Sequence, residues 1–287
     1  MSGAPTVLRE APNLGTLFPK AVVTGFTKKG GKTLPERTYV RQGVRVDPGH
    51  LADYNRVCEF RLTDALPITY PHMLTFPMQV KLMTDDDFPF PLVGSVHLAN
   101  VITQHRPLRV GETFDLRVHV ENLRPHAKGK QFDMISEAIV GDEVVWHDTS
   151  TYLRRGGGSP DAPSESGPGE RGALPAPSAV WRVPGDTGRR YAEVSGDRNP
   201  IHLYGLTAKL FGFPRAIAHG MWTKARCLAA FEGRLPEAYT VDVRFKLPVL
   251  LPAKVGFHAE QVGKDWKFDL FDARKPKPHI EGLITTL

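Results

Sequence analysis

The sequence predicts an α+β fold in which one arrangement, a long helix followed by antiparallel strands, occurs twice. A Gly- and Pro-rich segment divides the chain, and each half contains one apolar helical segment followed by segments that alternate apolar and polar side chains. Arg106–Phe114 also matches Leu247–Val255 at a constant offset of 141 residues, with a proline at the second position of each. This ordered match indicates an internal repeat.

Length and composition limit the class of protein. The 287 residues suffice for two ordinary domains, and 41% are apolar, but no apolar run reaches the roughly 18 residues of a membrane helix. The N-terminus lacks the basic start and apolar centre of a signal peptide, so we expect a cytoplasmic protein without membrane partners. Cys58 and Cys227 lie far apart and outside any metal-ligand spacing, which favours free thiols.

The formal charge of +6 favours anionic partners, such as small phosphorylated ligands or an acidic carrier protein. The Lys and Arg residues are scattered and form no nucleic-acid motif, so we expect no nucleic-acid partner.

Residues 156–178 are the segment that divides the chain. They are rich in Gly and Pro, and Leu174 is their only large apolar residue. Such a segment buries too little surface to offset its ordering entropy, which predicts a flexible linker. The predicted domains are therefore residues 1–155 and residues 179–287.

The second half begins with a predicted short strand at 179–183. A helix follows, with Asp186 or Thr187 as its cap and Gly196 as its end. Another helix is predicted from His219 to about Leu235, with Gly233 placed to stop it. The period then changes to two, which predicts strands at 239–246, 254–262, 266–273 and 279–287.

The first half follows the same plan. The segment 69–80 takes the place of the second half's long helix, with His72 opposite His219. Alternating segments at 114–123, 130–140 and 143–153 predict strands.

A P-loop-like motif occurs at Gly25–Thr33, but its two glycines are separated by five residues instead of four. The sequence after it starts with a proline and has no helical period, whereas a P-loop needs a helix that presents its amide groups to phosphate. We therefore expect a basic surface loop.

The segment after Gly196 carries an acid and an imidazole close together. Asn199 as an N-cap and Pro200 at the first helical position fit a simple turn between helices. That interpretation gives no reason for Asp197 or His202. Acid and imidazole at the start of a short rigid helix suit the transfer of two protons in one step.

The stretch Tyr191–Ala208, "YAEVSGDRNPIHLYGLTA", closely resembles the signature of the MaoC-like (R)-specific enoyl-thioester hydratases, G-D-x-N-P-[ILV]-H after an aromatic residue and before a small one. The segment 213–221, "FPRAIAHGM", resembles the family's entry into its central helix. The resemblance directly covers residues 180 to 287. It implies a hotdog fold, in which an antiparallel sheet wraps around the central helix, and two units in one chain resemble the double-hotdog members.

The resemblance implies reversible hydration of trans-2-enoyl thioesters to (R)-3-hydroxyacyl thioesters, or the reverse dehydration, in fatty-acid or related acyl metabolism. Asp197 and His202 would be catalytic and hold one water. Asn199 and Gly220 would be substrate-binding residues, although Asn199 also fits a role in holding the loop. The N–H of Gly220, at a helix N-terminus, would stabilise negative charge on the thioester oxygen. We interpret His219 as a residue that starts the helix.

No metal or redox cofactor is implied, because the phosphopantetheine of coenzyme A or of an acyl carrier protein is part of the substrate. A homodimer of double-hotdog chains is possible. The first half lacks the signature: Asp53 and Asn55 are present, but no histidine lies five residues beyond Asp53. We therefore predict that this half is not catalytic.

Two other functions stay open. One is a non-catalytic acyl-thioester binding or scaffold protein, which the intact Asp197 and His202 disfavour. The other is a hotdog thioesterase, which would use an acid on the central helix; none occurs there before Glu232.

Overall fold

The structure is a computed structural model that describes residues 4–27, 31–159, 162, 175–275 and 277–287. Contacts between residues divide the chain into two compact units. The first comprises Met1–Arg45, Pro71–Asn100 and Gly111–Glu170, and the second comprises Val46–Tyr70, Val101–Val110 and Arg171–Leu287. No helix in the described ranges is both long and apolar enough to cross a membrane.

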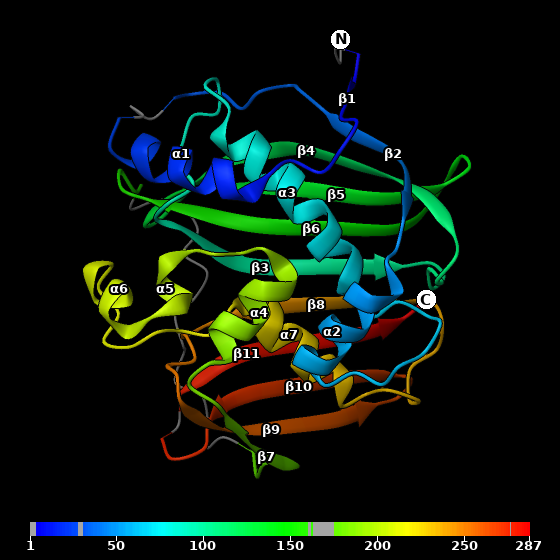
Figure 1. Cartoon of the computed structure of the whole chain (residues 1–287). Coiled ribbons are helices and arrows are strands. Elements are labelled where there is room, and N and C mark those ends of the chain that lie inside the picture. The colour runs from blue at the N-terminus through cyan, green and yellow to red at the C-terminus, as the bar shows by residue number, and fades with distance from the viewer. Residues whose placement is uncertain (1–3, 28–30, 160–161, 163–174, 276) are drawn as a thin grey trace. The chain divides into compact units, whose positions relative to one another are not determined.

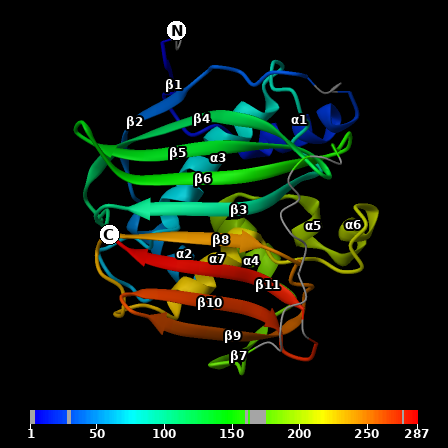
Figure 2. The ribbon, with the colours of Figure 1, turned by 180° about the vertical axis from the view of Figure 1, so that it is seen from behind.

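The second unit is built on antiparallel strands in the order β8-β11-β10-β9-β7 (Figures 1 and 2). Their bounds are β7 (Ala179–Val183), β8 (Tyr239–Phe245), β9 (Ala253–Val262), β10 (Asp265–Asp272) and β11 (Pro278–Thr286). All five predicted strands are confirmed to within two residues. In β8 the predicted alternation appears as burial, because Tyr239, Val241 and Val243 are buried between less buried residues.

Helix α7 (Gly220–Ala229) packs on one face of this sheet, as the two opposite views show (Figures 1 and 2). It is shorter than the predicted helix, which was expected to reach Leu235. The backbone tightens after Ala229, where the N–H groups of Ala230 and Phe231 donate to carbonyls only three residues earlier. Gly233, with a φ of +78°, then reverses the chain, so it ends a turn and not the helix itself.

Helix α4 (Thr187–Ser195) begins and ends as predicted. Its N-cap residue is Asp186, although the side chain makes no capping hydrogen bond. Gly196 ends the helix in the left-handed conformation, and its N–H donates to the carbonyl of Ala192. Two short helices, α5 (Pro200–Leu203) and α6 (Gly205–Leu210), follow.

The first unit has strands in the order β1-β2-β4-β5-β6-β3. Their bounds are β1 (Thr6–Val7), β2 (Tyr39–Arg45), β3 (Ser95–Gln104), β4 (Thr113–His126), β5 (Gly129–Val140) and β6 (Glu143–Arg155). The three strands predicted from alternation are β4, β5 and β6, and they are confirmed. The last residues of β3, from Val101 on, belong to the second unit.

Helix α3 (Tyr70–Thr84) lies on one face of the strands of the first unit (Figures 1 and 2). It contains the segment 69–80 that the sequence pairs with α7. The strand order β2-β4-β5-β6-β3 repeats the order β7-β9-β10-β11-β8 of the second unit when elements are matched along the chain. This identity of order confirms the internal repeat.

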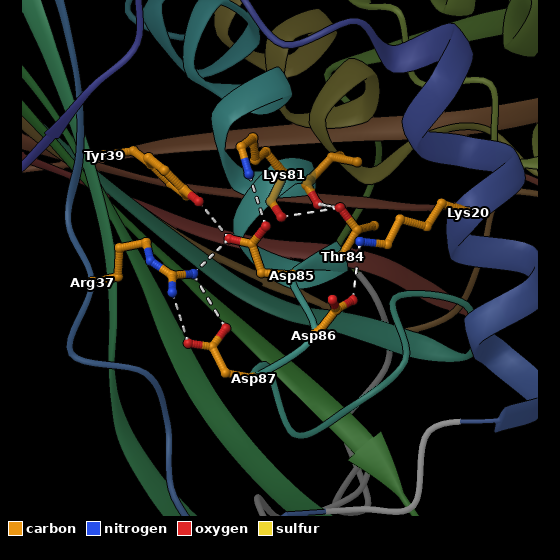
Figure 3. Close-up of polar contacts among 9 residues, drawn as sticks. Lys20, Arg37, Tyr39, Lys81, Thr84, Asp85, Asp86 and Asp87 are labelled. Carbon is orange, nitrogen blue, oxygen red and sulfur yellow. Dashed lines mark hydrogen bonds and ion pairs between the residues drawn. The ribbon is translucent and has the colours of Figure 1, made fainter.

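A polar network fixes the C-terminal end of α3 (Figure 3). The carboxylate of Asp85 accepts hydrogen bonds from Arg37, Tyr39 and Lys81. Asp87 accepts two further hydrogen bonds from the Arg37 guanidinium. Because each of these acids forms an ion pair with a basic side chain, we interpret the network as a structural support for the end of α3.

Helix α2 (Pro48–Cys58) precedes the predicted linker in sequence, yet it belongs to the second unit. The Trp222 indole of α7 donates to the carbonyl of Val57 at 2.9 Å, and Arg226 forms an ion pair with Glu59 at 2.8 Å.

The predicted domain boundaries, 1–155 and 179–287, stay a prediction. Most of the predicted linker, residues 160–161 and 163–174, lies outside the described residues.

Two smaller predictions concern loops and thiols. The P-loop-like segment was expected to be a surface loop, but Gly25–Thr27 form the end of α1 (Leu14–Thr27), and residues 28–30 lie outside the described residues. No helix follows the segment before Asp47, which agrees with the exclusion of a P-loop. Cys58 and Cys227 are free thiols, as predicted. Both are buried, and burial raises the pKa of both thiols.

Candidate active site

The loop after α4 gives Asp197 a defined position. The left-handed Gly196, with a φ of 72°, turns the chain, and the N–H of Asp197 then donates to the Ser195 hydroxyl at 3.2 Å. The Asp197 carboxylate accepts the N–H of Asn199 at 3.1 Å, which forms an Asx turn. One carboxylate oxygen is therefore used inside the loop, while the side chain keeps 22% exposure.

Asn199 caps α5, as the sequence predicts. Its side chain accepts a long hydrogen bond from the N–H of Ile201 at 3.5 Å, and Pro200 occupies the first helical position. These contacts support the role of Asn199 in holding the loop. A contact of Asn199 with substrate stays a prediction.

His202, on α5, has its tautomer set by a backbone carbonyl. Its Nδ1 lies 2.9 Å from the carbonyl oxygen of Ile217. A carbonyl only accepts hydrogen bonds, so Nδ1 carries the proton, and a neutral His202 presents the lone pair of Nε2. Burial lowers the pKa of His202, although the Asp197 carboxylate and the Ile217 carbonyl act in the opposite direction. The side chain is thus prepared to accept a proton at neutral pH.

His219 lies between the other two groups. Its ring stacks on the ring of His202 with centroids 3.7 Å apart, and its Nε2 donates to the backbone carbonyl of Asp197 at 3.0 Å. The same Nε2 lies 3.7 Å from the Asp197 carboxylate. Within the described part of the chain, its buried Nδ1 has no hydrogen-bond partner. Burial, and then His202, lower the pKa of His219 well below its usual value.

The position of His219 extends its predicted role. It does precede α7 as the N-cap residue, but its side chain makes no capping hydrogen bond and joins the loop to His202 instead. Its sequence neighbours gave no signal of this stacking, because the two histidines meet only through the packing of α5 against the start of α7.

One nitrogen or oxygen from each of Asp197, His202 and His219 lies within 4.8 Å of the others. Such a set has the composition of a metal site. However, Nδ1 of His202 and Nε2 of His219 already donate to carbonyls, which leaves one nitrogen of each ring for any further partner. The expectation that no metal takes part stays a prediction.

Gly220 begins α7, where the first backbone N–H groups have no partner within the helix. A Cβ atom at Gly220 would lie 3.1 Å from the ring of Phe245, so the position has little room for a side chain. The end of α7 that carries the positive helix dipole therefore lies beside His219 and faces a tightly packed aromatic ring.

Among residues 4–27 and 31–155 of the first half, the structure shows no counterpart of this site. Helices α2 and α4 both end in a left-handed residue, Glu59 with a φ of 63° and Gly196 with a φ of 72°. Matching these ends places Phe60 opposite Asp197 and Ala65 opposite His202. Asp53 instead lies inside α2 and forms an ion pair with Arg56 at 2.6 Å, and the buried Asn55 donates to the carbonyl of Arg61.

The first unit does contain a buried histidine–aspartate pair. His72, at the start of α3, lies 2.6 Å from the carboxylate of Asp148 on β6. The same carboxylate accepts hydrogen bonds from Asn100 at 2.8 Å and from Ser150 at 3.0 Å. The Asp148 side chain is 0% exposed, so its carboxylate contacts neighbouring side chains and not solvent.

Comparisons with known proteins agree with the sequence signature. The model of the MaoC-like domain family matches residues 176–282. The chain is 41% identical over 254 residues to 3-hydroxyacyl-thioester dehydratase X of Mycobacterium tuberculosis, and the match covers 88% of this chain and 91% of that protein.

Solved structures give the same result. The crystal structure of HtdX of Mycobacterium tuberculosis has a TM-score of 0.78 and 39% identity, with 88% of this chain and 100% of that chain covered. A MaoC-like dehydratase from Phytophthora capsici has a TM-score of 0.70 at 19% identity, covering 87% of this chain and 94% of that one, and so shows the fold alone. Together these matches confirm the predicted double-hotdog fold.

Proposed function

Because the chain belongs to the MaoC-like family, we propose that it catalyses the reversible hydration of trans-2-enoyl thioesters to (R)-3-hydroxyacyl thioesters. The observation that carries the proposal is the cluster of Asp197, His202 and His219, whose polar atoms lie within 4.8 Å of one another. Two groups able to transfer protons lie next to a helix N-terminus that favours negative charge.

In the hydration direction, one water lies between Asp197 and His202. The neutral His202 accepts a proton of the water at Nε2 as the hydroxyl oxygen bonds to C3, and the protonated carboxyl group of Asp197 gives its proton to C2. The proton on His202 then passes to the Asp197 carboxylate, which restores both groups. In dehydration the same two protons move in the opposite direction, and the C3 hydroxyl leaves as water. The hydrogen bond from Nδ1 to Ile217 supports this assignment, because it leaves Nε2 as the accepting nitrogen.

Negative charge develops on the thioester oxygen while C2 gains or loses its proton. The N–H groups at the start of α7, with that of Gly220 first, are the donors that this charge requires. The thioester oxygen would bind there, and Phe245 would pack against the same backbone. No cofactor takes part in this mechanism, because the thioester itself acidifies the C2 proton.

His219 acts as a positioning residue in this proposal. Its hydrogen bond to the Asp197 carbonyl holds the loop, and its ring supports the ring of His202. The low pKa that burial gives His219 keeps its ring neutral at physiological pH, so the stacked pair carries no mutual charge repulsion.

The other two candidate functions lack comparable support. A thioesterase of this fold would need an acid on the central helix, and α7 (Gly220–Ala229) contains none. A non-catalytic acyl-thioester scaffold would have no need of the acid and imidazole that the loop holds in place.

One assay separates the three functions. Purified protein is mixed with crotonyl-CoA and with a longer enoyl-CoA, and the enoyl absorbance and the free thiol are followed together. We expect loss of the enoyl band without thiol release, and turnover of (R)- but not (S)-3-hydroxybutyryl-CoA in the reverse direction. Thiol release would show a thioesterase, and neither signal would show a binding protein; either result overturns the proposal.

A further inference from the structure

Helix α2 lies beside helix α4 in the second unit (Figures 1 and 2), although α2 comes from the half of the chain that the sequence predicts to be non-catalytic. Helix α4 leads directly into the loop that carries Asp197. The contact between the two helices includes a hydrogen bond between His50 and the carbonyl of Val194, which are 144 residues apart in the sequence. A residue outside the signature therefore binds the backbone just before the proposed catalytic acid.

The carbonyl of Val194 is one that α4 cannot pair by itself. It belongs to the last turn, where the final carbonyls have no N–H partner within the helix. Nε2 of His50 lies 2.9 Å from this carbonyl oxygen. Because a carbonyl only accepts hydrogen bonds, Nε2 carries the proton. His50 thus donates to the end of the helix that precedes Gly196.

Tyr70 sets the orientation of the His50 ring. Its hydroxyl oxygen lies 3.0 Å from Nδ1 of His50. With the proton on Nε2, Nδ1 of the neutral ring has a lone pair, so the Tyr70 hydroxyl is the donor. Tyr70 is buried, and burial raises the pKa of its hydroxyl, so the hydroxyl keeps its proton at physiological pH. Both ring nitrogens of His50 are therefore used in one chain of hydrogen bonds that runs from Tyr70 to Val194.

Further hydrogen bonds connect the end of α4 to Asp197. The hydroxyl of Ser195, the last residue of α4, accepts the N–H of Asp197 at 3.2 Å and donates to the carbonyl of Tyr191 at 2.8 Å. The carbonyl of Asp197 accepts from His219 at 3.0 Å. The backbone is thus held on both sides of the Asp197 side chain. A shift of the end of α4 would therefore move Asp197 relative to His202.

Aromatic packing between α2 and the site supports the same arrangement. The ring of Tyr54, on α2, packs edge-to-face against Tyr70 with centroids 5.2 Å apart. It also lies 6.3 Å from the ring of Tyr191, which in turn lies 4.9 Å from the ring of His219. The three tyrosines are at most 3% exposed. Because a close-packed interior leaves little room for independent movement, α2 is firmly attached to the residues around the site.

We propose that His50, oriented by Tyr70, is a positioning residue of the candidate active site. The inference rests on the proposed function, and it adds a residue of the first half to those that the reaction requires. His50 acts through the Val194 carbonyl and not on the substrate. By holding the end of α4, it keeps the Asp197 carboxylate at a distance from His202 that one water molecule can bridge. A displacement of about 1 Å at such a site costs about 100-fold in rate.

The test compares His50→Leu with the matched control His258→Leu. His258 has the same intermediate exposure as His50, and its Nδ1 lies 2.9 Å from a backbone carbonyl, that of Ala176. It is on β9, and its carbonyl partner belongs neither to α4 nor to the catalytic loop. In steady-state hydration of crotonyl-CoA, we expect His50→Leu to lower kcat about 10- to 100-fold and to leave KM within about threefold. The control should leave both constants unchanged, and an equal loss in the control would overturn the proposal.

Two further variants separate positioning from folding. His50→Gln keeps an N–H donor at about the reach of Nε2 and should recover most of the rate. Tyr70→Phe removes only the hydroxyl that orients the ring, so it should lower kcat about three- to tenfold and carries the test even where His50→Leu fails to fold. The full rate in Tyr70→Phe, or a His50→Gln protein as slow as His50→Leu, would contradict the proposed role.

A double-mutant cycle tests whether His50 acts through Asp197. In the Asp197→Asn background the acid is already absent, so adding His50→Leu should have almost no further effect on kcat. A loss of the same size in both backgrounds would show that His50 does not act by positioning Asp197.

Hydrogen exchange provides a measurement that needs no turnover. We expect faster exchange of the amides in peptides that cover residues 192–202 in His50→Leu, and no change in His258→Leu. Unchanged exchange in His50→Leu would refute the contribution of His50 to the loop. If the wild-type protein hydrates no enoyl thioester, the proposed function fails, whereas full hydration by His50→Leu refutes the role of His50 alone.

Discussion

Each half of the chain places a histidine at the start of its sheet-packed helix and an aspartate within reach of it. In the first unit His72 binds the carboxylate of Asp148 directly, at 2.6 Å. In the second unit His219 binds the backbone carbonyl of Asp197, and its distance to the carboxylate is 3.7 Å. The same residue types thus form a closed pair in one half and an open one in the other.

The difference is the reason why we propose the second pair, and not the first, as the reactive one. Asp148 is fully buried and its carboxylate accepts bonds from three side chains, so it has no capacity for a substrate. Asp197 is 22% exposed, its carboxylate accepts the N–H of Asn199, and it lies within 4.8 Å of a nitrogen of His202. An acid and an imidazole stabilise a fold when they hydrogen-bond directly to each other. They can act on a ligand when hydrogen bonds to backbone groups keep the two side chains apart.

The largest effect is expected from breaking the open pair. Asp197→Asn and His202→Ala should each lower kcat/KM by about 10³-fold, because each removes one group of a two-proton transfer. The double variant should be little worse than either single one if the groups act together. Steady-state assays of enoyl-CoA hydration check this, with circular dichroism as the control for folding. Near-normal turnover by either variant would remove that residue from the site.

Breaking the closed pair should reduce stability instead. Asp148→Asn should lower the free energy of unfolding by about 3 kcal/mol, because His72 loses its buried charged partner. Asp53→Asn is the matched control, because its ion pair with Arg56 has the same 2.6 Å distance but is exposed. We expect at most about 1 kcal/mol there. Denaturant titrations measure both, and equal losses would contradict the comparison.

A smaller effect is expected at the start of α7. Gly220→Ala places a Cβ atom 3.1 Å from the Phe245 ring, so the helix start must shift by a few tenths of an ångström. Because catalysis depends on position at this scale, kcat should fall about tenfold. The double variant Gly220→Ala/Phe245→Leu restores space and should recover part of the rate. No recovery would show that the methyl group blocks the substrate itself.

The smallest effect concerns pH. The pKa values of His202 and His219 are lowered in the folded protein, mainly by burial, so below about pH 6.5 the unfolded state binds more protons than the folded one. The free energy of unfolding should therefore fall as the pH decreases from 6.5. Each of the two histidines should contribute a loss of about 1 kcal/mol per pH unit. His219→Asn, which keeps a donor for the Asp197 carbonyl, should flatten this slope. An unchanged slope would show that His219 is not the titrating group.

The sequence predicted strands better than it predicted the helix contacts. Alternation in β8 and in β4 to β6 reports a half-buried sheet face and is local, so it can be read from the residues alone. The Gly196–His202 loop was also predictable, since caps and turns depend on neighbours within a few residues. The stacking of His219 on His202 was not, because it depends on tertiary packing.

Helix α2 shows the same limit more strongly. Its sequence carries a good N-cap, Asp47, and Pro48 at the first turn, but nothing in its sequence indicates contact with residues far along the chain. The length of α7 was overestimated because apolar periodicity continues past Ala229 into a tight turn. Local patterns therefore located the acid and imidazole but not the elements that hold them.

The place of α2 has a consequence for the order in which the protein folds during synthesis. Val57 and Trp222, which share a hydrogen bond, are 165 residues apart, and Tyr54 packs near Tyr191. The ribosome therefore synthesises α2 long before the residues that contact it. Until those residues are made, the face of α2 that is buried in the folded protein is exposed to solvent or bound by a chaperone. The strands β4 to β6 pair with neighbours that emerge one after another. The second unit is therefore completed only after its strands β8 to β11 have been made.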